Sequence, residues 1–224
     1  MPEVNLLWRY PSAKRNIGAR LAIKEENRAA ALKFDREYFD GTREQGYGGY
    51  RYDGRWQKIA RDMVEYWDLK PGMKVLDVGC AKGFLVKDLL AACPGLQVYG
   101  VDISHYGLTH AEAEAKGRLV RASCEALPFP DRSFDAVIGI NVIHNLPHEQ
   151  CLKAIREIER LAPGRGYIQV DAYRSEDERA LFLEWMLTCK CFDTPEGWRR
   201  RFAKAGYTGD YYWTILEIDE NIVR

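Results

Sequence analysis

Residues 74–83, Lys-Val-Leu-Asp-Val-Gly-Cys-Ala-Lys-Gly, decide the fold of this 224-residue chain. The run Lys74–Val78 is short and mostly apolar, follows the turn pair Pro71-Gly72 and leads into a glycine loop, which is typical of a buried parallel strand. Apolar residues from Phe84 to Cys93 then recur at helical spacing. The stretch therefore predicts a strand, a tight loop and a helix, which is the opening unit of a doubly wound α/β sheet.

The alternation of strands and helices continues along most of the chain. We expect strands at 96–101, 119–121, 134–140, 166–171 and within 211–218, and helices at 105–116, 148–161, 176–183 and 195–205. The segment 185–192 is compatible with a further strand. The predicted fold class is α/β, a Rossmann-like doubly wound sheet that is mostly parallel and carries an antiparallel strand near the C-terminus.

The beginning of the chain has a different character. Residues 24–38 predict a helix, and the Tyr- and Gly-rich stretch 46–56 has neither helical nor strand periodicity. Residues 58–67 predict the helix that leads into the first strand of the sheet. We therefore divide the chain into an N-terminal helical extension with a lid, residues 1–57, and a Rossmann-like domain, residues 58–224.

Composition excludes several classes of function. The 33 basic and 33 acidic side chains cancel, so the chain lacks the basic footprint of a nucleic-acid-binding protein. No apolar run is long enough to span a membrane, and the start does not resemble a signal peptide, so we expect a cytoplasmic protein. Six cysteines are too few and too scattered for a disulfide scaffold, and Cys189-Lys190-Cys191 has the wrong spacing for zinc. We expect reduced thiols, no metal, and a monomer or homodimer.

The position of Asp77 distinguishes between two kinds of ligand. A dinucleotide site rests a pyrophosphate on the helix N-terminus, and a carboxylate at this point would repel it. S-adenosylmethionine has no phosphate but carries an ammonium and a sulfonium, which a carboxylate attracts. Gly79 and Gly83 allow close backbone approach, and Asp102 follows at the distance of an acid that accepts ribose hydroxyls. These residues favour S-adenosylmethionine over NAD.

The chain resembles the class I S-adenosylmethionine-dependent methyltransferases, within them the small-molecule, type 11-like subgroup. The resemblance covers about residues 58–218 and rests on VLDVGCAKG, VYGVDIS, ALPFPDRSFDAVIGINVIHNL and AGYTGDYYW. It implies a site at the carboxyl ends of the strands, where many relatives have an Asp near the adenine in place of Ser123. The cofactor contacts implied by the resemblance and the motif are Asp77, Gly79, Cys80, Gly83, Asp102, Ile103, Ser123, Cys124 and Asn141.

Three polar residues beyond the fourth and fifth parallel strands are candidate catalytic residues. Asn141 is placed to orient cofactor or nucleophile, although an Asn there also suits a helix cap. His144 is a candidate general base, because its ordinary pKa lies near neutrality, or a residue that packs against the cofactor. Tyr173 is expected to line the substrate pocket.

The Tyr/Gly-rich stretch predicts a lid over the cofactor. Aromatic faces attract a sulfonium, and a guanidinium can pair with a carboxylate, so we expect contacts from Tyr47, Tyr50 and Arg55. Its four glycines, at 46, 48, 49 and 54, supply the backbone freedom for closure. The simpler alternative is a surface loop whose aromatic residues pack on the core.

The expected activity is in-line transfer of the methyl group of S-adenosylmethionine to a small molecule in biosynthesis. Three alternatives remain open. The first is a non-methylating enzyme, which directs cyclisation or aminocarboxypropyl chemistry and releases methylthioadenosine. The second is a nucleic-acid methyltransferase, disfavoured by the neutral charge and by Asn141-Val142-Ile143-His144 in place of an Asn-Pro-Pro-Tyr loop. The third is a binding module without catalysis.

Overall fold

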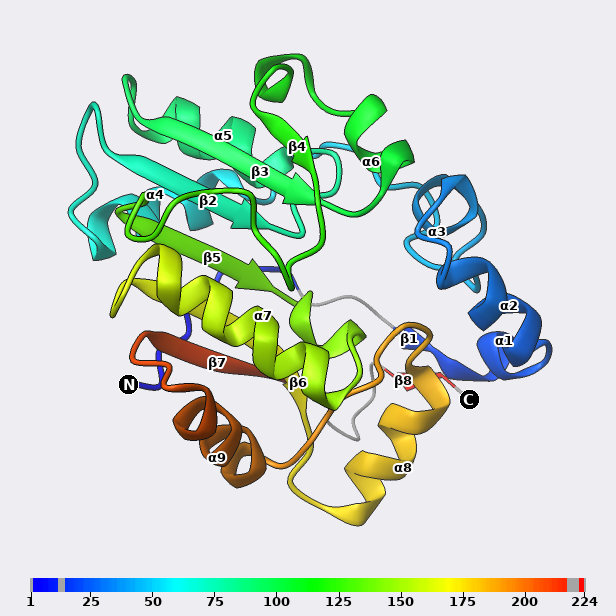
Figure 1. Ribbon diagram of the computed structural model, residues 1–224. Helices are drawn as coiled ribbons and strands as arrows, with labels where there is room; N and C mark the ends of the chain where they lie inside the picture. The colour runs from blue at the N-terminus through cyan, green and yellow to red at the C-terminus, as the bar shows by residue number, and fades with distance from the viewer. Residues whose placement is uncertain (1, 12–14, 217–221, 224) are drawn as a thin grey trace.

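A six-stranded parallel sheet forms the centre of the computed structural model, which describes residues 2–11, 15–216 and 222–223 (Figure 1). The strand order is β4-β3-β2-β5-β6-β7. From β2 to β4 the chain adds strands toward one edge of the sheet, and from β5 to β7 it adds them toward the other edge. The carboxyl ends of β2 and β5 therefore form the switch point, which is where ligands bind in such sheets. The strands are β2 (Lys74–Val78), β3 (Gln97–Asp102), β4 (Leu119–Arg121), β5 (Ala136–Ile140), β6 (Gly166–Ala172) and β7 (Asp210–Ile215).

Helices cover both faces of the sheet. On one face α4 (Gln57–Tyr66) and α5 (Phe84–Ala92) bury Met63 and Leu89 in one core cluster. On the other face α7 (His148–Leu161) and α9 (Pro195–Ala205) lie side by side and bury residues such as Trp198 against β6 (Figure 1). The sheet is therefore apolar on both sides, as the continuous apolar strands predict.

The N-terminal helices gather beyond the carboxyl ends of the strands. They are α1 (Ile17–Leu21), α2 (Lys24–Ala31) and α3 (Arg36–Asp40), and α1 packs on α8 (Glu176–Trp185) (Figure 1). Arg20 fixes this packing, because its guanidinium donates to the backbone carbonyls of Trp185 (2.9 Å), Arg43 (2.8 Å) and Gly46 (3.2 Å). Beside them β1 (Arg15–Asn16) pairs with β8 (Ile222–Val223). The division of the chain at residues 57 and 58 stays a prediction.

The predicted antiparallel strand is wrong, since β7 runs parallel to β6 throughout their pairing. Two helices, α8 and α9, connect the strands, and a connection of this length lets the chain cross over and enter the sheet in the same direction. The start of the chain covers the outer edge of β7, where Val4 N–H donates to the Tyr211 carbonyl at 3.0 Å. Residues 217 and 218 of the predicted last strand lie outside the described residues.

Two predicted helices are interrupted by tertiary contacts. The helix at 24–38 is split between α2 and α3, where Phe34 takes a φ of +49° and Ser104 Oγ donates to its carbonyl at 2.5 Å. The helix at 105–116 stops as α6 (His105–Thr109) and resumes as the 3-10 turn η1 (Ala113–Ala115). Glu112 N–H between them donates to the Lys82 carbonyl at 3.0 Å.

The segment 185–192 forms no strand. Beyond the end of α8 it crosses the carboxyl ends of the sheet, and the N–H groups of Lys190 and Cys191 both donate to the His144 carbonyl at 2.9 Å. His144 itself belongs to the 3-10 turn η2 (Ile143–Asn145). The apolar residues of the segment, Trp185, Met186 and Phe192, pack against the small core cluster that contains Ile17 and Phe182.

Among the described helices, none combines the length and the apolar character needed to cross a membrane. All six cysteines are buried and unpaired in the structure.

Candidate functional site

A cavity of about 540 Å³ lies at the carboxyl ends of β2, β5, β6 and β7. The sheet contributes Asp77, Asn141, Gln169 and Thr214 to its wall. The N-terminal segment and the stretch after α8 close the opposite side. Aromatic side chains dominate that side: Tyr10, Tyr38, Tyr47, Tyr50, Trp56 and Trp185.

Asp77 is the strongest electrostatic feature of the cavity. Its side chain is near the end of β2 and the residue is only 6% exposed. No described residue donates a hydrogen bond or offers a cation to its carboxylate, and burial, followed by the repulsion of Asp102, raises the pKa of Asp77 to about 7. A buried carboxylate without a partner is costly. The site therefore favours a ligand that brings positive charge.

Asp102 ends β3 and organises the loop that follows β2. Its Oδ2 accepts from Ala81 N–H and its Oδ1 from Ser104 N–H, both at 2.8 Å. Burial raises the pKa of Asp102, while these backbone donors oppose the shift. Each carboxylate oxygen retains a second acceptor site, so Asp102 can accept a ribose hydroxyl while it holds the loop. Its side chain does not line the cavity.

The two motif glycines are required by protein packing. Gly79 has a φ of +80°, and a Cβ there would lie 2.8 Å from Val142. Gly83 is the N-cap residue immediately before α5, with a φ of +72°, and a Cβ there would lie 2.7 Å from the Cβ of Ala115. Gly79 lines the cavity and Gly83 does not. For Gly83 the reason is therefore helix packing rather than approach to a ligand.

Two tyrosines from the predicted lid reach the cavity. The rings of Tyr47 and Tyr50 lie 4.3 Å apart, and Tyr50 stacks on Phe84 at 4.5 Å. The ring of Tyr47 also packs edge-on against Tyr38, with ring centres 5.2 Å apart. Tyr52 points elsewhere, since its hydroxyl donates to Asp88 Oδ1 at 2.6 Å. The cavity thus meets aromatic faces on the side opposite the sheet.

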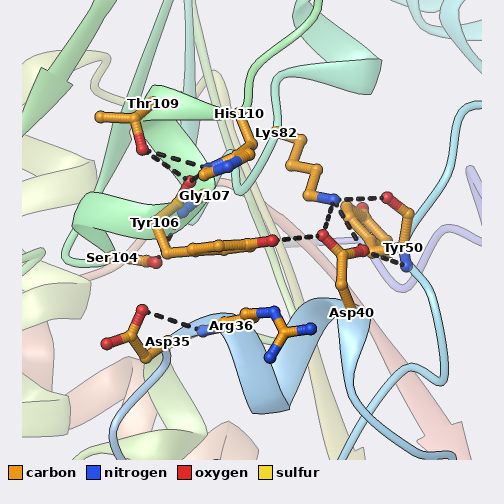
Figure 2. Close-up of polar contacts among 10 residues, drawn as sticks. All are labelled: Asp35, Arg36, Asp40, Tyr50, Lys82, Ser104, Tyr106, Gly107, Thr109 and His110. Atoms are coloured by element: carbon orange, nitrogen blue, oxygen red, sulfur yellow. Dashed lines mark hydrogen bonds and ion pairs between the residues drawn. The ribbon is translucent and has the colours of Figure 1, made fainter.

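Asp40, at the end of α3, connects the predicted lid to the glycine loop that follows β2 (Figure 2). Lys82 Nζ lies 2.6 Å and 2.8 Å from the two carboxylate oxygens and 3.0 Å from the Tyr50 carbonyl. Tyr106 donates to the same carboxylate at 2.8 Å, and Tyr50 N–H donates at 3.1 Å. Burial alone would raise the pKa of Asp40, but the bonds from Lys82 and Tyr106 outweigh it and lower the pKa. We call Asp40, Lys82 and Tyr106 the latch.

Arg55 lines the cavity but already has partners. Its guanidinium forms hydrogen bonds with Asp53 at 2.5–2.9 Å and with the Tyr10 hydroxyl at 3.2 Å. The bonds with Asp53, and then the bond with Tyr10, raise the pKa of Arg55. A ligand carboxylate would therefore have to compete with Asp53 for this guanidinium.

His144 lines the cavity and is 4% exposed. A protonated ring would pair with Asp171, whose Oδ2 lies 3.4 Å from Nδ1, but burial lowers the pKa of His144 to about 3. In the neutral ring Nδ1 accepts from Asp171 N–H at 3.0 Å. The nitrogen lone pair that a general base needs is already engaged. The predicted catalytic role stays a prediction, and this geometry supports a positioning role instead.

His144, Asp171 and Cys189 form a group of potential metal ligands, with one ligand atom of each within 4.8 Å of the others. Metal binding would require the His144 lone pair that Asp171 N–H now occupies, and a thiolate at Cys189, whose pKa is raised by burial. The trio is therefore better explained by its own hydrogen bonds, and we assign no metal to it.

The structure brings together only part of the predicted site. The predicted residues that line the cavity are Tyr47, Tyr50, Arg55, Asp77, Gly79, Cys80, Asn141 and His144. Tyr173 instead packs edge-on against Phe192, with ring centres 5.5 Å apart. Ser123 shares hydrogen bonds with Glu125, Cys124 is buried in the core, and Ile103 is 53% exposed. Those three assignments, which concern the adenine end, remain predictions.

Several cavity residues were missed by the sequence reasoning. Gln169 and Thr214 lie on β6 and β7, and their side chains face the cavity only because the two strands are parallel and in register, with Gln169 opposite Tyr212. Trp185 to Cys189 also line the cavity. The feature of the sequence that could have identified them is a polar residue, Gln169 or Thr214, within an otherwise apolar strand.

Comparison with known proteins agrees with this geometry. A model of the methyltransferase domain matches residues 76–170. The chain is 34% identical over 161 residues to the sterol 24-C-methyltransferase ERG6B of Gibberella zeae, which covers 69% of this chain and 38% of that protein. It is 29% identical over 189 residues to the demethylmenaquinone methyltransferase of Thermus thermophilus, which covers 71% of this chain and 84% of that protein.

The likeness extends to solved structures. The YcgJ protein of Bacillus subtilis matches with a TM-score of 0.54 and 19% identity over 68% of each chain, which supports the fold. This chain spans well under two thirds of the sterol methyltransferase, and the relatives' names refer to acceptors as different as sterols, demethylmenaquinone and tRNA. The matched domain, the parallel sheet and the acids at its switch point agree with one another, and the chain belongs to the class I S-adenosylmethionine-dependent methyltransferase family.

Proposed function

We propose that this protein binds S-adenosylmethionine at the carboxyl ends of its sheet and transfers the methyl group to a small-molecule acceptor. The observation that carries the proposal is Asp77, a buried carboxylate that faces the cavity without a partner among the residues that the structure describes. The methionine part of the cofactor carries both an ammonium and a sulfonium. Either cation would stabilise the ionised form of Asp77.

The remaining cofactor contacts follow from the arrangement of the loop. The ribose hydroxyls are assigned to Asp102, which retains acceptor capacity beside its two backbone donors. The sulfonium is assigned to the side lined by Tyr47 and Tyr50, since aromatic faces attract cations. This orientation places the reactive carbon inside the cavity, away from bulk water.

The chemical step needs little from the protein beyond alignment. The acceptor attacks the methyl carbon in line with the sulfur, the carbon–sulfur bond breaks, and its electron pair neutralises the sulfonium. Positioning and exclusion of water are therefore the main contributions. Because His144 has no free lone pair at neutral pH, an acceptor that must lose a proton during attack needs another base.

A small acceptor fits the enclosure better than a macromolecule. The cavity volume of about 540 Å³ lies in the range of small-ligand pockets. The chain has no net charge, whereas a nucleic-acid enzyme benefits from a basic surface. The proposed setting is a cytoplasmic biosynthetic enzyme that acts as a monomer or homodimer.

A second candidate is a reaction of S-adenosylmethionine with itself. The amine of the methionine part would attack its own γ-carbon, the methylene bonded to the sulfur. The bond from this carbon to sulfur breaks, its electron pair neutralises the sulfonium, the amine loses a proton, and a small ring closes while methylthioadenosine leaves. The side of the cavity lined by Tyr47 and Tyr50 favours this candidate, because the latch holds this stretch in place and would restrict entry of a second substrate.

The thioether product separates the two candidates. The purified protein is incubated with S-adenosylmethionine, alone and with small-molecule extracts or tRNA, and the thioether is identified by mass spectrometry. We expect adenosylhomocysteine that appears only when a small-molecule acceptor is present. Methylthioadenosine formed without any acceptor would instead establish cyclisation, and activity confined to tRNA would refute the small-molecule assignment.

Asp77→Asn should stabilise the ligand-free protein at high pH. The pKa of Asp77 is raised from its unfolded value to about 7, so the folded protein holds this proton more tightly than the unfolded chain does. The folding stability that results is fully present below about pH 4 and is lost as pH rises through about 7. Asn cannot ionise and avoids this loss. We expect a gain of about 2–4 kcal/mol in unfolding free energy at about pH 8 and almost none at about pH 4, measured by urea denaturation. Equal effects at both pH values would contradict the raised pKa.

Loss of the latch should open the lid. Lys82→Met leaves Asp40 without its cation and removes the hydrogen bond to the Tyr50 carbonyl, so chymotryptic cleavage within residues 41–56 should accelerate roughly tenfold, equivalent to about 1.4 kcal/mol. Lys70→Met is the matched control, since Lys70 pairs with Asp68 on the exposed surface. Saturating S-adenosylmethionine should slow cleavage of the wild type. Unchanged cleavage in Lys82→Met would show that the latch does not hold the lid.

A further inference from the structure

Asn141 occupies a strained position at the carboxyl end of β5. It is one of the few residues other than glycine with a left-handed backbone, at a φ of +52°. Its N–H donates to the Gln169 carbonyl at 2.8 Å, and its carbonyl accepts from Asn145 Nδ2 at 3.2 Å. Its side chain lines the cavity. Strain of this kind persists where surrounding contacts impose it, often at functional sites.

A chain of hydrogen bonds crosses the sheet and ends on the Asn141 side chain. It begins at Leu6 N–H, which donates to the Tyr167 hydroxyl at 3.3 Å, and Tyr167 contacts Gln169 Oε1 at 3.0 Å. Gln169 Nε2 contacts Thr214 Oγ1 at 3.1 Å, and Thr214 Oγ1 lies 3.1 Å from Asn141 Oδ1. Tyr167 is fully buried and Gln169 is 7% exposed. The chain therefore lies within the protein until it reaches the cavity.

The direction of this chain is fixed by its first member. A backbone N–H can only donate, so the Tyr167 oxygen accepts from Leu6 and its single hydrogen goes to Gln169 Oε1. Gln169 Nε2 then donates to Thr214, whose own hydrogen goes to Asn141 Oδ1. The reverse direction would leave the buried Tyr167 hydrogen without an acceptor, at a cost of about 1–3 kcal/mol.

We propose that Asn141 presents its Nδ2 amide hydrogens to an oxygen of the ligand, and that Thr214, Gln169 and Tyr167 are positioning residues that fix this orientation. The Oδ1 end of the amide is occupied by Thr214, and no described residue accepts from Nδ2. Amide hydrogens favour a carboxylate or carbonyl oxygen and disfavour an ammonium. The inference deepens the proposed function and rests on it.

Two oxygens could be the partner, one on the methionine carboxylate and one on the acceptor molecule. Adenosylhomocysteine carries the carboxylate and methylthioadenosine lacks it, so the affinities of these two probes distinguish the sources. A contact with the methionine carboxylate affects only adenosylhomocysteine. A contact with the acceptor affects neither probe but lowers the rate of thioether release.

The test compares Thr214→Val with Thr214→Ser by calorimetry. Valine keeps the shape but lacks the hydroxyl, so Asn141 can turn its amide, and affinity for adenosylhomocysteine should fall about 3- to 10-fold, the effect of one misdirected hydrogen bond. Serine should restore most of the affinity, and methylthioadenosine should bind all three proteins equally. If the oxygen is on the acceptor, the same pattern should appear in the rate of thioether release.

Asn141→Asp provides an independent variant, because it keeps an oxygen for Thr214 but has no amide hydrogens. It should lose at least as much as Thr214→Val. In the ligand-free protein the Asn141 side-chain amide signals, assigned by their absence in Asn141→Asp, should move in Thr214→Val and stay in Thr214→Ser. The proposal is overturned if valine and serine behave alike, or if Asn141→Asp retains wild-type affinity and rate. A wild type that binds neither probe would refute the proposed function, while the amide signals still test the orientation.

Discussion

The buried carboxylate of Asp77 is the constraint on which the rest of the site depends. A carboxyl group with almost no exposure and no partner among the described residues is unfavourable in its ionised form, and its pKa near neutrality reflects this cost. Burial causes most of the cost, and repulsion from Asp102, at the end of the neighbouring strand β3, adds to it. A cationic ligand would offset it. The site therefore favours a positively charged ligand even in the ligand-free protein.

The other walls of the cavity complement the acidic side chain of Asp77. The proposed lid contributes Tyr47 and Tyr50, and the latch ties this stretch to Lys82 in the glycine loop that follows β2. The glycine loop and the proposed lid are consequently joined through one partly buried ion pair. On the far side, the hydrogen-bond chain through Gln169 and Thr214 presents a donor from Asn141. Acid, aromatic faces and amide donor together match the ammonium, sulfonium and carboxylate of one methionine group.

Local patterns in the sequence predicted most of the fold. The bounds of α7, α9 and β4 follow directly from periodicity and from turn residues, and the glycine loop with its two acids identified the cofactor motif. The predictions that differ from the structure concern features set by contacts between residues that are distant in the sequence. The direction of β7 is set by a crossover of two helices, and the 185–192 segment is held by the His144 carbonyl rather than by strand pairing. Thr214 and Gln169 could not be assigned to the site before the register of β6 and β7 was known.

Proton release on ligand binding tests the central claim, that Asp77 is an unpaired acid awaiting a cation. The measurement is calorimetric titration with S-adenosylmethionine at about pH 6, where the ligand amine is already protonated, in two buffers of different ionisation enthalpy. Asp77, largely protonated before binding, should ionise against the bound cation and release about one proton, and Asp77→Asn should release almost none. Binding without proton release, or equal release by wild type and Asp77→Asn, would contradict the account.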